Sequence, residues 1–270
     1  MLAEDSLRKG NLAESLAQLQ DQVRKEPANA KSRVFLFQLL AVMGDWKRAL
    51  TQLGVLGEMD ASTLAMVQTY REAVRCEALR AEVFAGERSP MLFGEPEQWV
   101  ALLMEALRLT ARGHHAQAQE LRSQALESAP ATPGTIDEAA FEWIADADSR
   151  LGPILETIVN GRYYWIPFHR IRRIAVEAPS DLRDIVWTPA RFEWANGGEG
   201  VGLIPSRYPG SERSEDVSIR MARRTEWIEG EAEAYTGMGQ RTLATDTDEY
   251  PLMNVRSIRL EPGNGAAAAD

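Results

Sequence analysis

Two glycines of this chain, Gly10 and Gly44, stand 34 residues apart, each between stretches of helical periodicity. This spacing is the period of the tetratricopeptide repeat, in which a short turn joins two antiparallel helices. Glycine ends the first helix of such a pair because it adopts positive φ at little cost. A proline should then end the second helix, and Pro27 stands 17 residues after Gly10. The spacing therefore predicts stacked helix pairs at the start of the chain.

The same pattern recurs further along, with one interruption. Gly113 is again followed by a proline, Pro130, 17 residues later. No glycine stands near position 78, where another turn is due, and residues 63–85 favour one long helix. Apolar residues recur at i, i+3, i+4 and i+7, so each helix must bury a stripe against a neighbour. We predict a TPR-like α/α superhelix over residues 1–130; an ordinary helical domain with a chance spacing is the alternative.

The composition changes after Gly161, where aromatic and β-branched residues favour strands. Residues 191–194 alternate between polar and apolar, residues 196–200 signal a tight turn, and residues 201–204 can form the partner strand of a hairpin. Short strands with glycine turns are typical of small barrels or sandwiches. We therefore predict an α+β chain that ends in a small antiparallel, barrel-like domain over residues 161–262.

A proline- and glycine-rich stretch, residues 129–136, separates the two halves and predicts a linker. The segment that follows begins with helical character, so residues 131–160 are predicted to be a linker with a junction helix. The last residues, 263–270, combine glycine and alanine without an apolar pattern, and we expect them to be disordered.

Composition excludes several classes of partner. The chain has 270 residues and a formal net charge of −10, so it does not attract nucleic-acid phosphates. Its only dense basic cluster, Arg170, Arg172 and Arg173, is expected to be the solvated rim of a strand. No signal peptide and no apolar run of membrane-spanning length is present, which favours a cytoplasmic protein. A single cysteine, Cys76, fits a reducing compartment and is expected to be buried.

From Phe141 onward the chain resembles the ImpE family, also called the TagJ or SciE type. The resemblance rests on an ordered series of motifs: Trp143-Ile144-Ala145-Asp146-Ala147-Asp148-Ser149-Arg150-Leu151-Gly152-Pro153, Gly161-Arg162-Tyr163-Tyr164-Trp165-Ile166-Pro167-Phe168, Asp181-Leu182-Arg183-Asp184-Ile185-Val186-Trp187, Arg207-Tyr208-Pro209-Gly210-Ser211, Thr225-Glu226-Trp227 and Gly237-Met238-Gly239-Gln240-Arg241. A repeat-like N-terminal half is also expected of this family.

The resemblance implies a non-enzymatic accessory protein of the bacterial type VI secretion system, with no cofactor. Such a protein would bind a helix of the small sheath subunit, TssB, at the N-terminus of that subunit. It would thereby influence sheath assembly or recycling of the sheath by the ClpV ATPase. A general TPR-like scaffold unrelated to secretion is the alternative that the repeat pattern alone allows.

An amphipathic partner helix would lie with its apolar face in a hydrophobic groove. In a TPR-like superhelix the groove is lined by the first helix of each pair, which gives Lys31, Val34, Gln38, Ala41, Leu103 and Leu107. A second possible groove lies at an aromatic cluster in the β half, Tyr164, Trp165 and Phe168. Core packing is the competing interpretation for each apolar member of these sets.

Asp146, Asp148 and Arg150 form the strongest local group of charges. Two carboxylates could hold a metal ion or act as acid and base, as in a metal-dependent hydrolase. An EF-hand loop starting at Asp146 would need glycine and glutamate where Leu151 and Thr157 stand. We therefore predict a structural role, in which Arg150 pairs with carboxylates at the junction of the two halves.

The other candidate sites have simpler interpretations. The acidic group Asp246, Asp248 and Glu249 is expected to be a solvated loop, and His114 with His115 an exposed helix start. The glycines of residues 237–241 resemble part of a phosphate loop. Because the lysine of GxxxxGK[ST] and a following helix are missing, we predict no nucleotide site.

Overall fold

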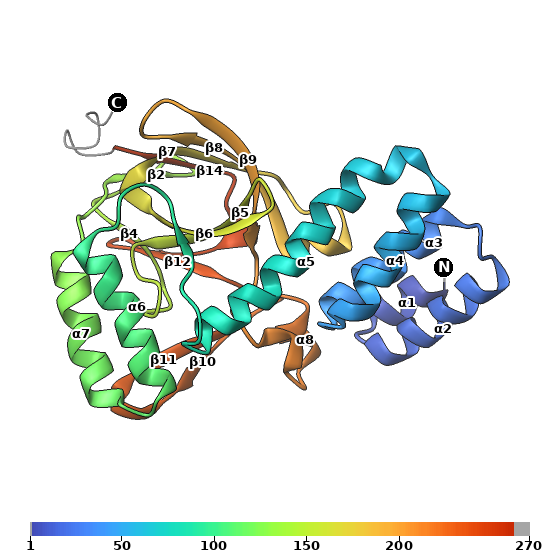
Figure 1. The fold of residues 1–270 in the computed structure, drawn as a ribbon, viewed down its shortest axis with the longest axis horizontal. Coiled ribbons are helices and arrows are strands. Elements are labelled where there is room, and N and C mark those ends of the chain that lie inside the picture. Colours follow the sequence, from blue (N-terminus) through green and yellow to red (C-terminus); the bar gives the residue numbers. More distant parts are fainter. Residues whose placement is uncertain (1, 262–270) are drawn as a thin grey trace.

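The computed structural model describes residues 2–261 and shows an α+β protein, in which most helices precede most strands along the chain (Figure 1). Its α-helices are α1 (Leu2–Arg8), α2 (Leu12–Lys25), α3 (Ala30–Val42), α4 (Trp46–Met59), α5 (Leu64–Phe84), α6 (Gln98–Ala111), α7 (His115–Ser128) and α8 (Val217–Arg220). The long helix predicted over residues 63–85 is confirmed as α5. None of the helices among the described residues has the length and apolar character that crossing a bilayer requires.

The strands begin within the helical half and continue nearly to the end of the described chain. They are β1 (Met91–Leu92), β2 (Gly134–Ile136), β3 (Ala139–Phe141), β4 (Ile144–Asp146), β5 (Ile154–Val159), β6 (Arg162–Pro167), β7 (Ile171–Val176), β8 (Trp187–Trp194), β9 (Glu199–Pro205), β10 (Thr225–Glu229), β11 (Tyr235–Gly239), β12 (Thr242–Thr245), β13 (Glu249–Pro251) and β14 (Ser257–Leu260). The hairpin predicted around residues 191–204 is confirmed, because β8 pairs with β9 in antiparallel register.

The turns between the paired helices have the predicted geometry. Gly10, Gly44 and Gly113 have φ of +81°, +71° and +79°, and each stands two positions after the last residue of a helix. The helices α2 and α4 begin with a side-chain cap: Asn11 accepts from the amide of Glu14, and Asp45 from that of Arg48. These caps satisfy amide groups that would otherwise lack an intrahelical partner.

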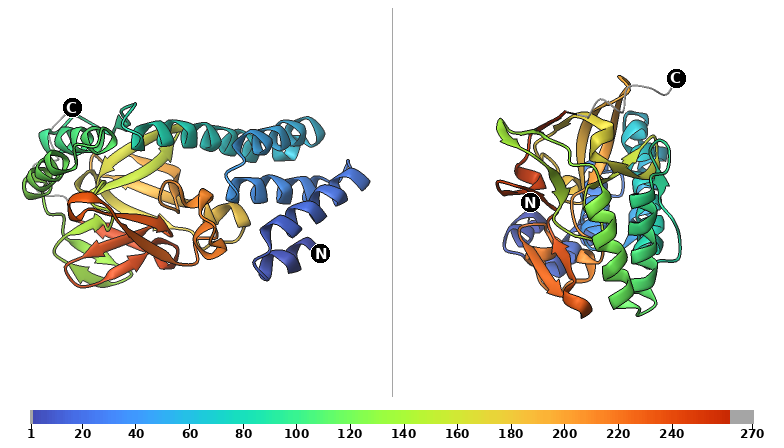
Figure 2. Two further views of the ribbon diagram at one scale, coloured as in Figure 1. Left: turned by 90° about the horizontal axis from the view of Figure 1, so that it is seen from below. Right: turned by 90° about the vertical axis from the view of Figure 1, so that its left-hand side faces the viewer.

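The helices of residues 1–130 do not form one continuous stack. In Figure 1, α1–α4 lie at one end of the molecule, and α6 and α7 lie beside the sheet at the other end. Helix α5 runs between the two groups, and the second view agrees (Figure 2). The third turn glycine is Gly86, with φ of +71°, which comes only after the full length of α5.

Within the described residues the largest sheet has nine strands in the order β1-β6-β5-β9-β8-β7-β14-β2-β3. Pairing is antiparallel except between β1 and β6, which are parallel, so the sheet is mixed. Its edge strands β1 and β3 are not paired with each other in this part of the chain. The sheet is therefore open, and the predicted barrel-like closure is not found. Two smaller sheets, β10-β11 and β13-β12-β4, complete the strands described.

The predicted junction helix within residues 131–160 is wrong, because this segment forms strands. Strand β2 pairs with β14, and β4 pairs with β12, in both cases with partners about a hundred residues further along. The helical character of the sequence is overridden by these distant pairings. The tail over residues 263–270, predicted to be disordered, lies outside the described residues.

The large sheet separates two hydrophobic clusters, because successive side chains of a strand point to opposite faces. On β5, Ile154 and Ile158 belong to the cluster that includes the buried residues of α1–α6. Leu155 and Val159 belong to the other cluster, on the far face. Helices and sheet thus share one core, and any polar side chain on the helix-facing side of β5 must find a partner there.

Gly44 gives a test of how the helices dock on the β half. A Cβ at this position would lie 2.4 Å from Cγ of Glu212, whereas a Cβ at Gly113 would meet nothing within 4 Å. Both glycines have positive φ, so Gly113→Ala should lose about 1 kcal/mol of unfolding free energy through backbone strain alone. We expect Gly44→Ala to lose roughly 1–3 kcal/mol more through overpacking, measured by urea unfolding. Equal losses would contradict this docking.

Candidate functional site

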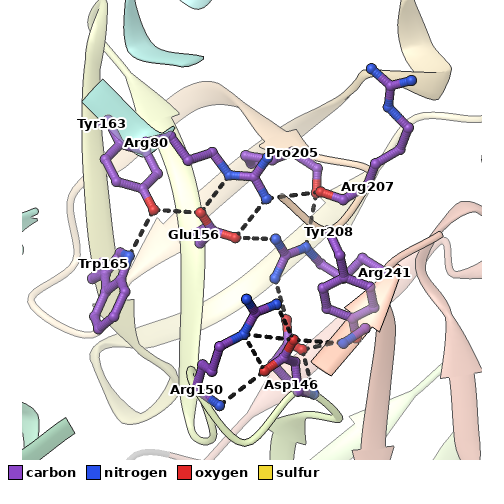
Figure 3. Close-up of polar contacts among 12 residues, drawn as sticks. Arg80, Asp146, Arg150, Glu156, Tyr163, Trp165, Pro205, Arg207, Tyr208 and Arg241 are labelled. Carbon is purple, nitrogen blue, oxygen red and sulfur yellow. Dashed lines mark hydrogen bonds and ion pairs between the residues drawn. The ribbon is translucent and has the colours of Figure 1, made fainter. Parts of the chain in front are cut away.

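A buried ion pair joins the helices to the sheet. Glu156 lies on the face of β5 that carries Ile154 and Ile158, so its carboxylate points toward α5. Arg80 of α5 donates to both carboxylate oxygens, from Nε to Oε1 at 2.7 Å and from Nη2 to Oε2 at 2.9 Å. This two-pronged contact, visible in Figure 3, is the strong geometry for an arginine and a carboxylate.

A second arginine continues the chain of charges. Arg241, in the link between β11 and β12, donates to Glu156 and also to Asp146 of β4. Its Nε donates to the carbonyl of Pro205 at 2.8 Å. The side chains of Arg241, Glu156 and Asp146 are fully buried, so each charge depends on the others for compensation.

The chain of contacts ends at Asp148 and Arg150. The amide of Asp148 donates to Asp146 at 2.9 Å, and Asp148 accepts from Arg150 Nη2 at 2.5 Å. Asp148 also accepts from the amide of Gly237 at 2.9 Å. The Arg150 guanidinium lies 5.0 Å from the ring centre of Phe84, at the end of α5. We call this group the junction network, and its members are Arg80, Asp146, Asp148, Arg150, Glu156 and Arg241.

Three aromatic side chains complete the hydrogen bonds of the network. The Tyr163 hydroxyl donates to Glu156 and accepts from Trp165 Nε1 at 2.7 Å. The Tyr208 hydroxyl donates to Asp146 at 3.0 Å. Because buried charges are costly when their lone pairs are unsatisfied, these hydroxyls stabilise the two carboxylates.

The electrostatics keep the carboxylates charged at neutral pH. Burial alone would raise the pKa of Glu156, but the charges of Arg80 and Arg241 outweigh it and lower the pKa to about 2. Burial raises the pKa of Asp146 to about 6, although Arg241 beside it favours the ionised form. Both groups are therefore ionised near pH 7, and the network holds alternating charges.

The lowered pKa of Glu156 predicts a pH dependence of stability. The folded protein holds this carboxylate at a pKa of about 2, below the ordinary value of 4.5. The ionised carboxylate therefore contributes to the free energy of unfolding above pH 4.5, and this contribution is lost as the pH falls toward 2. We expect the cost of Glu156→Gln to be about 1 kcal/mol smaller at pH 3.5 than at pH 7. Urea unfolding at the two pH values measures it, and an unchanged cost would contradict the assignment.

A further buried arginine fixes the end of α3 to the β half. Arg207 donates from Nη1 to the carbonyl of Val42 at 2.8 Å and to that of Arg220 at 2.6 Å. Its own carbonyl accepts from Arg80 Nη2 at 2.8 Å. A cation at the carbonyl end of a helix is stabilised by the helix dipole. Burial lowers the pKa of Arg207 to about 10, so it too is charged at neutral pH.

Most of the residues predicted to line a partner groove lie in the core. Exposed fractions of at most 5% are found for Gln38, Ala41, Leu103, Leu107, Trp165 and Phe168. Lys31 is exposed, and Val34 and Tyr164 are partly exposed. The buried residues offer no side-chain surface to a partner in this conformation. Trp165 shares the helix-facing cluster with Ala41, Leu103 and Leu107, whereas Phe168 and Tyr164 belong to the cluster on the far face of the sheet. A partner groove at Lys31 and Val34 stays a prediction.

Sequence reasoning missed Arg80, Glu156 and Arg241, which connect the network. One signal was present for Arg80: it lies four residues after Cys76 and three before Val83, on the buried stripe of α5. A charged residue on such a stripe requires a buried partner. Arg241 ends the motif of residues 237–241, whose Gly237 lets the backbone approach the Tyr208 ring, where a Cβ would lie at 2.3 Å.

The described residues contain no group of three or more histidine, cysteine, aspartate or glutamate side chains suited to a metal ion. Both carboxylates of the hydrolase alternative, Asp146 and Asp148, accept hydrogen bonds from arginine side chains. His169 lies 3.0 Å from Glu97, and His115 lies 3.6 Å from Glu231. No third ligand thus joins the two aspartates among the residues described.

The chain is an α+β protein in which buried ion pairs hold the helices against an open mixed sheet. Comparison with known proteins gives the family. Residues 138–259 match the model of the ImpE protein family. A curated relative from Pseudomonas aeruginosa, the type VI secretion system accessory component TagJ, is 53% identical over 262 residues, which cover 97% of this chain and 92% of the relative. The chain belongs to the ImpE family.

A solved structure supports the fold. The crystal structure of a Vibrio parahaemolyticus protein superimposes with a TM-score of 0.88 at 24% identity, covering 97% of this chain and 98% of that one. At this identity the likeness shows the fold alone, and it extends over both the helical part and the sheet.

Proposed function

We propose that the protein is a non-enzymatic adaptor of a bacterial type VI secretion system, acting in the cytoplasm. It would bind the N-terminal helix of the small sheath subunit, TssB, and modulate sheath assembly or ClpV-dependent recycling of the sheath. The observation that carries this proposal is the 53% identity, over nearly the whole chain, to an accessory component of that system.

The fold supports an adaptor. Helices joined by glycines of positive φ, as in α1–α2 and α3–α4, are the construction of TPR-like scaffolds, which present surfaces for peptides and helices. The junction network uses its carboxylates in ion pairs with arginines, which favours a role in holding the scaffold together. A scaffold of this kind needs no cofactor.

Calorimetric titration with the small sheath subunit tests the proposal. We expect saturable binding to the full-length subunit and none to a subunit that lacks its N-terminal helix. The large sheath subunit alone is the control for non-specific association. Absence of binding to the full-length subunit, with both proteins shown to be folded by circular dichroism, would refute the adaptor role with this partner.

A further inference from the structure

A pocket of about 400 Å³ lies between the end of α7 and the strand β4. Most of its lining comes from residues 143–153, with Leu126 and Ala129 at the end of α7 and Ala244 of β12 closing other sides. Figure 1 shows α7 and β4 at the same end of the molecule, away from α1–α4. We call this site the α7–β4 pocket.

The pocket wall is apolar and carries two large side chains that are open to solvent. Trp143 is 40% exposed and Leu126 is 38% exposed, although both residue types usually lie inside. Among the described residues that line the pocket, Asp146 alone has an ionisable side chain, and its carboxylate is already bound by Arg241 and Tyr208. An apolar recess with exposed aromatic and aliphatic side chains is typical of a protein-interaction site.

Exposed acidic side chains flank the pocket, whereas the nearby Arg122 and Arg150 are largely buried. Glu142 precedes Trp143, and its amide donates to the Asp246 carboxylate at 2.7 Å, which holds the two residues together beside the apolar wall. Glu127 follows Leu126 on α7, and all three acidic residues are exposed. No lysine or arginine lines the pocket in the described part of the chain. Such charges favour a partner with basic side chains next to its apolar ones.

The volume sets how much of a partner can enter. A cavity of about 150 Å³ accommodates a benzene ring, so a pocket of about 400 Å³ has room for two large side chains but not for a whole helix. Two apolar side chains three or four positions apart lie on the same face of a helix and can enter together.

We propose that the α7–β4 pocket receives two apolar side chains of a partner helix whose neighbouring side chains are basic. The proposal rests on the adaptor function above, and the helix is then that of the small sheath subunit. Its location differs from the groove predicted at Lys31 and Val34, which lies on α3. The same pocket borders Asp146, so an occupant would contact the strand that carries this member of the junction network.

Single substitutions at exposed positions test the site without disturbing the core. Titration calorimetry with the small sheath subunit should show at least tenfold weaker binding for Leu126→Glu and Trp143→Ala than for the wild type. Val201→Glu is the matched control, since Val201 is 69% exposed and lies outside the pocket. We expect its affinity to remain within about twofold of the wild type.

Charge reversal tests the acidic rim. Glu142→Lys should weaken binding at low salt and reduce its salt dependence, whereas Glu58→Lys on α4 should change neither.

Val34→Glu tests the competing groove on α3. Circular dichroism and unfolding midpoints confirm that each variant is folded.

The outcomes separate the two proposals. If the wild type binds and Leu126→Glu and Trp143→Ala bind equally well, the pocket is overturned while the adaptor function stands. Loss of binding only in Val34→Glu likewise overturns the pocket and assigns the groove on α3. If the wild type does not bind, the adaptor function fails, and the pocket loses its partner with it. A wild-type dimer that Leu126→Glu dissociates would place a second copy in the pocket and also overturn the proposal.

Discussion

Replacing Glu156 with glutamine is expected to lower the free energy of unfolding by about 3–5 kcal/mol. The change removes the charge that Arg80 and Arg241 share, yet it preserves the size of the side chain. Both guanidinium groups then stay buried, with exposed fractions of 5% and 0%, and the carboxylate left to Arg80 is the more distant Glu77 at 3.4 Å. Urea unfolding followed by tryptophan fluorescence at neutral pH measures the loss.

Glu193→Gln is the matched control on β8, which β9 separates from β5 in the same sheet. Glu193 pairs with Arg173 at 3.3 Å, but the two side chains are 42% and 44% exposed. Exposed pairs contribute about 0–1 kcal/mol, so we expect a small change at most. A cost for Glu156→Gln no larger than that of Glu193→Gln would show that the junction network adds nothing to stability.

Trp187→Ala should also lose about 3–5 kcal/mol, through the cavity it leaves. Trp187 belongs to β8, is fully buried, and contacts the rings of Trp46 on α4 and Tyr70 on α5 at 5.9 Å and 5.7 Å between centres. Its Nε1 donates to Glu77 at 2.9 Å. Because these contacts join the helices to the sheet, hydrogen exchange of α1–α4 should accelerate more than that of β5 and β6.

Trp143→Ala removes the same type of side chain from the surface, where Trp143 is 40% exposed. Truncating a partly exposed side chain removes less buried apolar area than truncating a buried one. The expected loss in the free energy of unfolding is therefore below about 1.5 kcal/mol. Uniform acceleration of exchange across the molecule in Trp187→Ala would contradict a local docking role and indicate only global destabilisation.

The features that the sequence predicts well have local causes. Gly10, Gly44 and Gly113 end helices because positive φ favours glycine, and the hairpin of β8 and β9 forms around a turn with two adjacent glycines. The long helix α5 follows from an uninterrupted period of 3.6 residues. Each of these signals lies within a window of about twenty residues, which a single sequence reveals.

The features that the sequence does not predict depend on distant partners. Strand β4 is specified by β12, with Asp146 opposite Leu243, and the segment alone resembles the start of a helix. Arg80 and Glu156 are 76 residues apart, so the sequence around either residue does not indicate that the other is its partner. The α7–β4 pocket combines α7, β4 and β12, and its walls are ordinary apolar residues until the fold brings them together.

The order in which the chain is synthesised gives the junction network a further consequence. Arg80 leaves the ribosome 76 residues before Glu156, and Glu156 precedes Arg241 by another 85. At about 5–20 residues per second, α5 is made many seconds before the last charge that completes its junction. Helices α1–α4 can pack during that interval, while the sheet-facing side of α5 remains uncovered. Final docking is therefore a late event, and until then the sheet-facing side of α5 is the kind of exposed apolar surface that promotes aggregation.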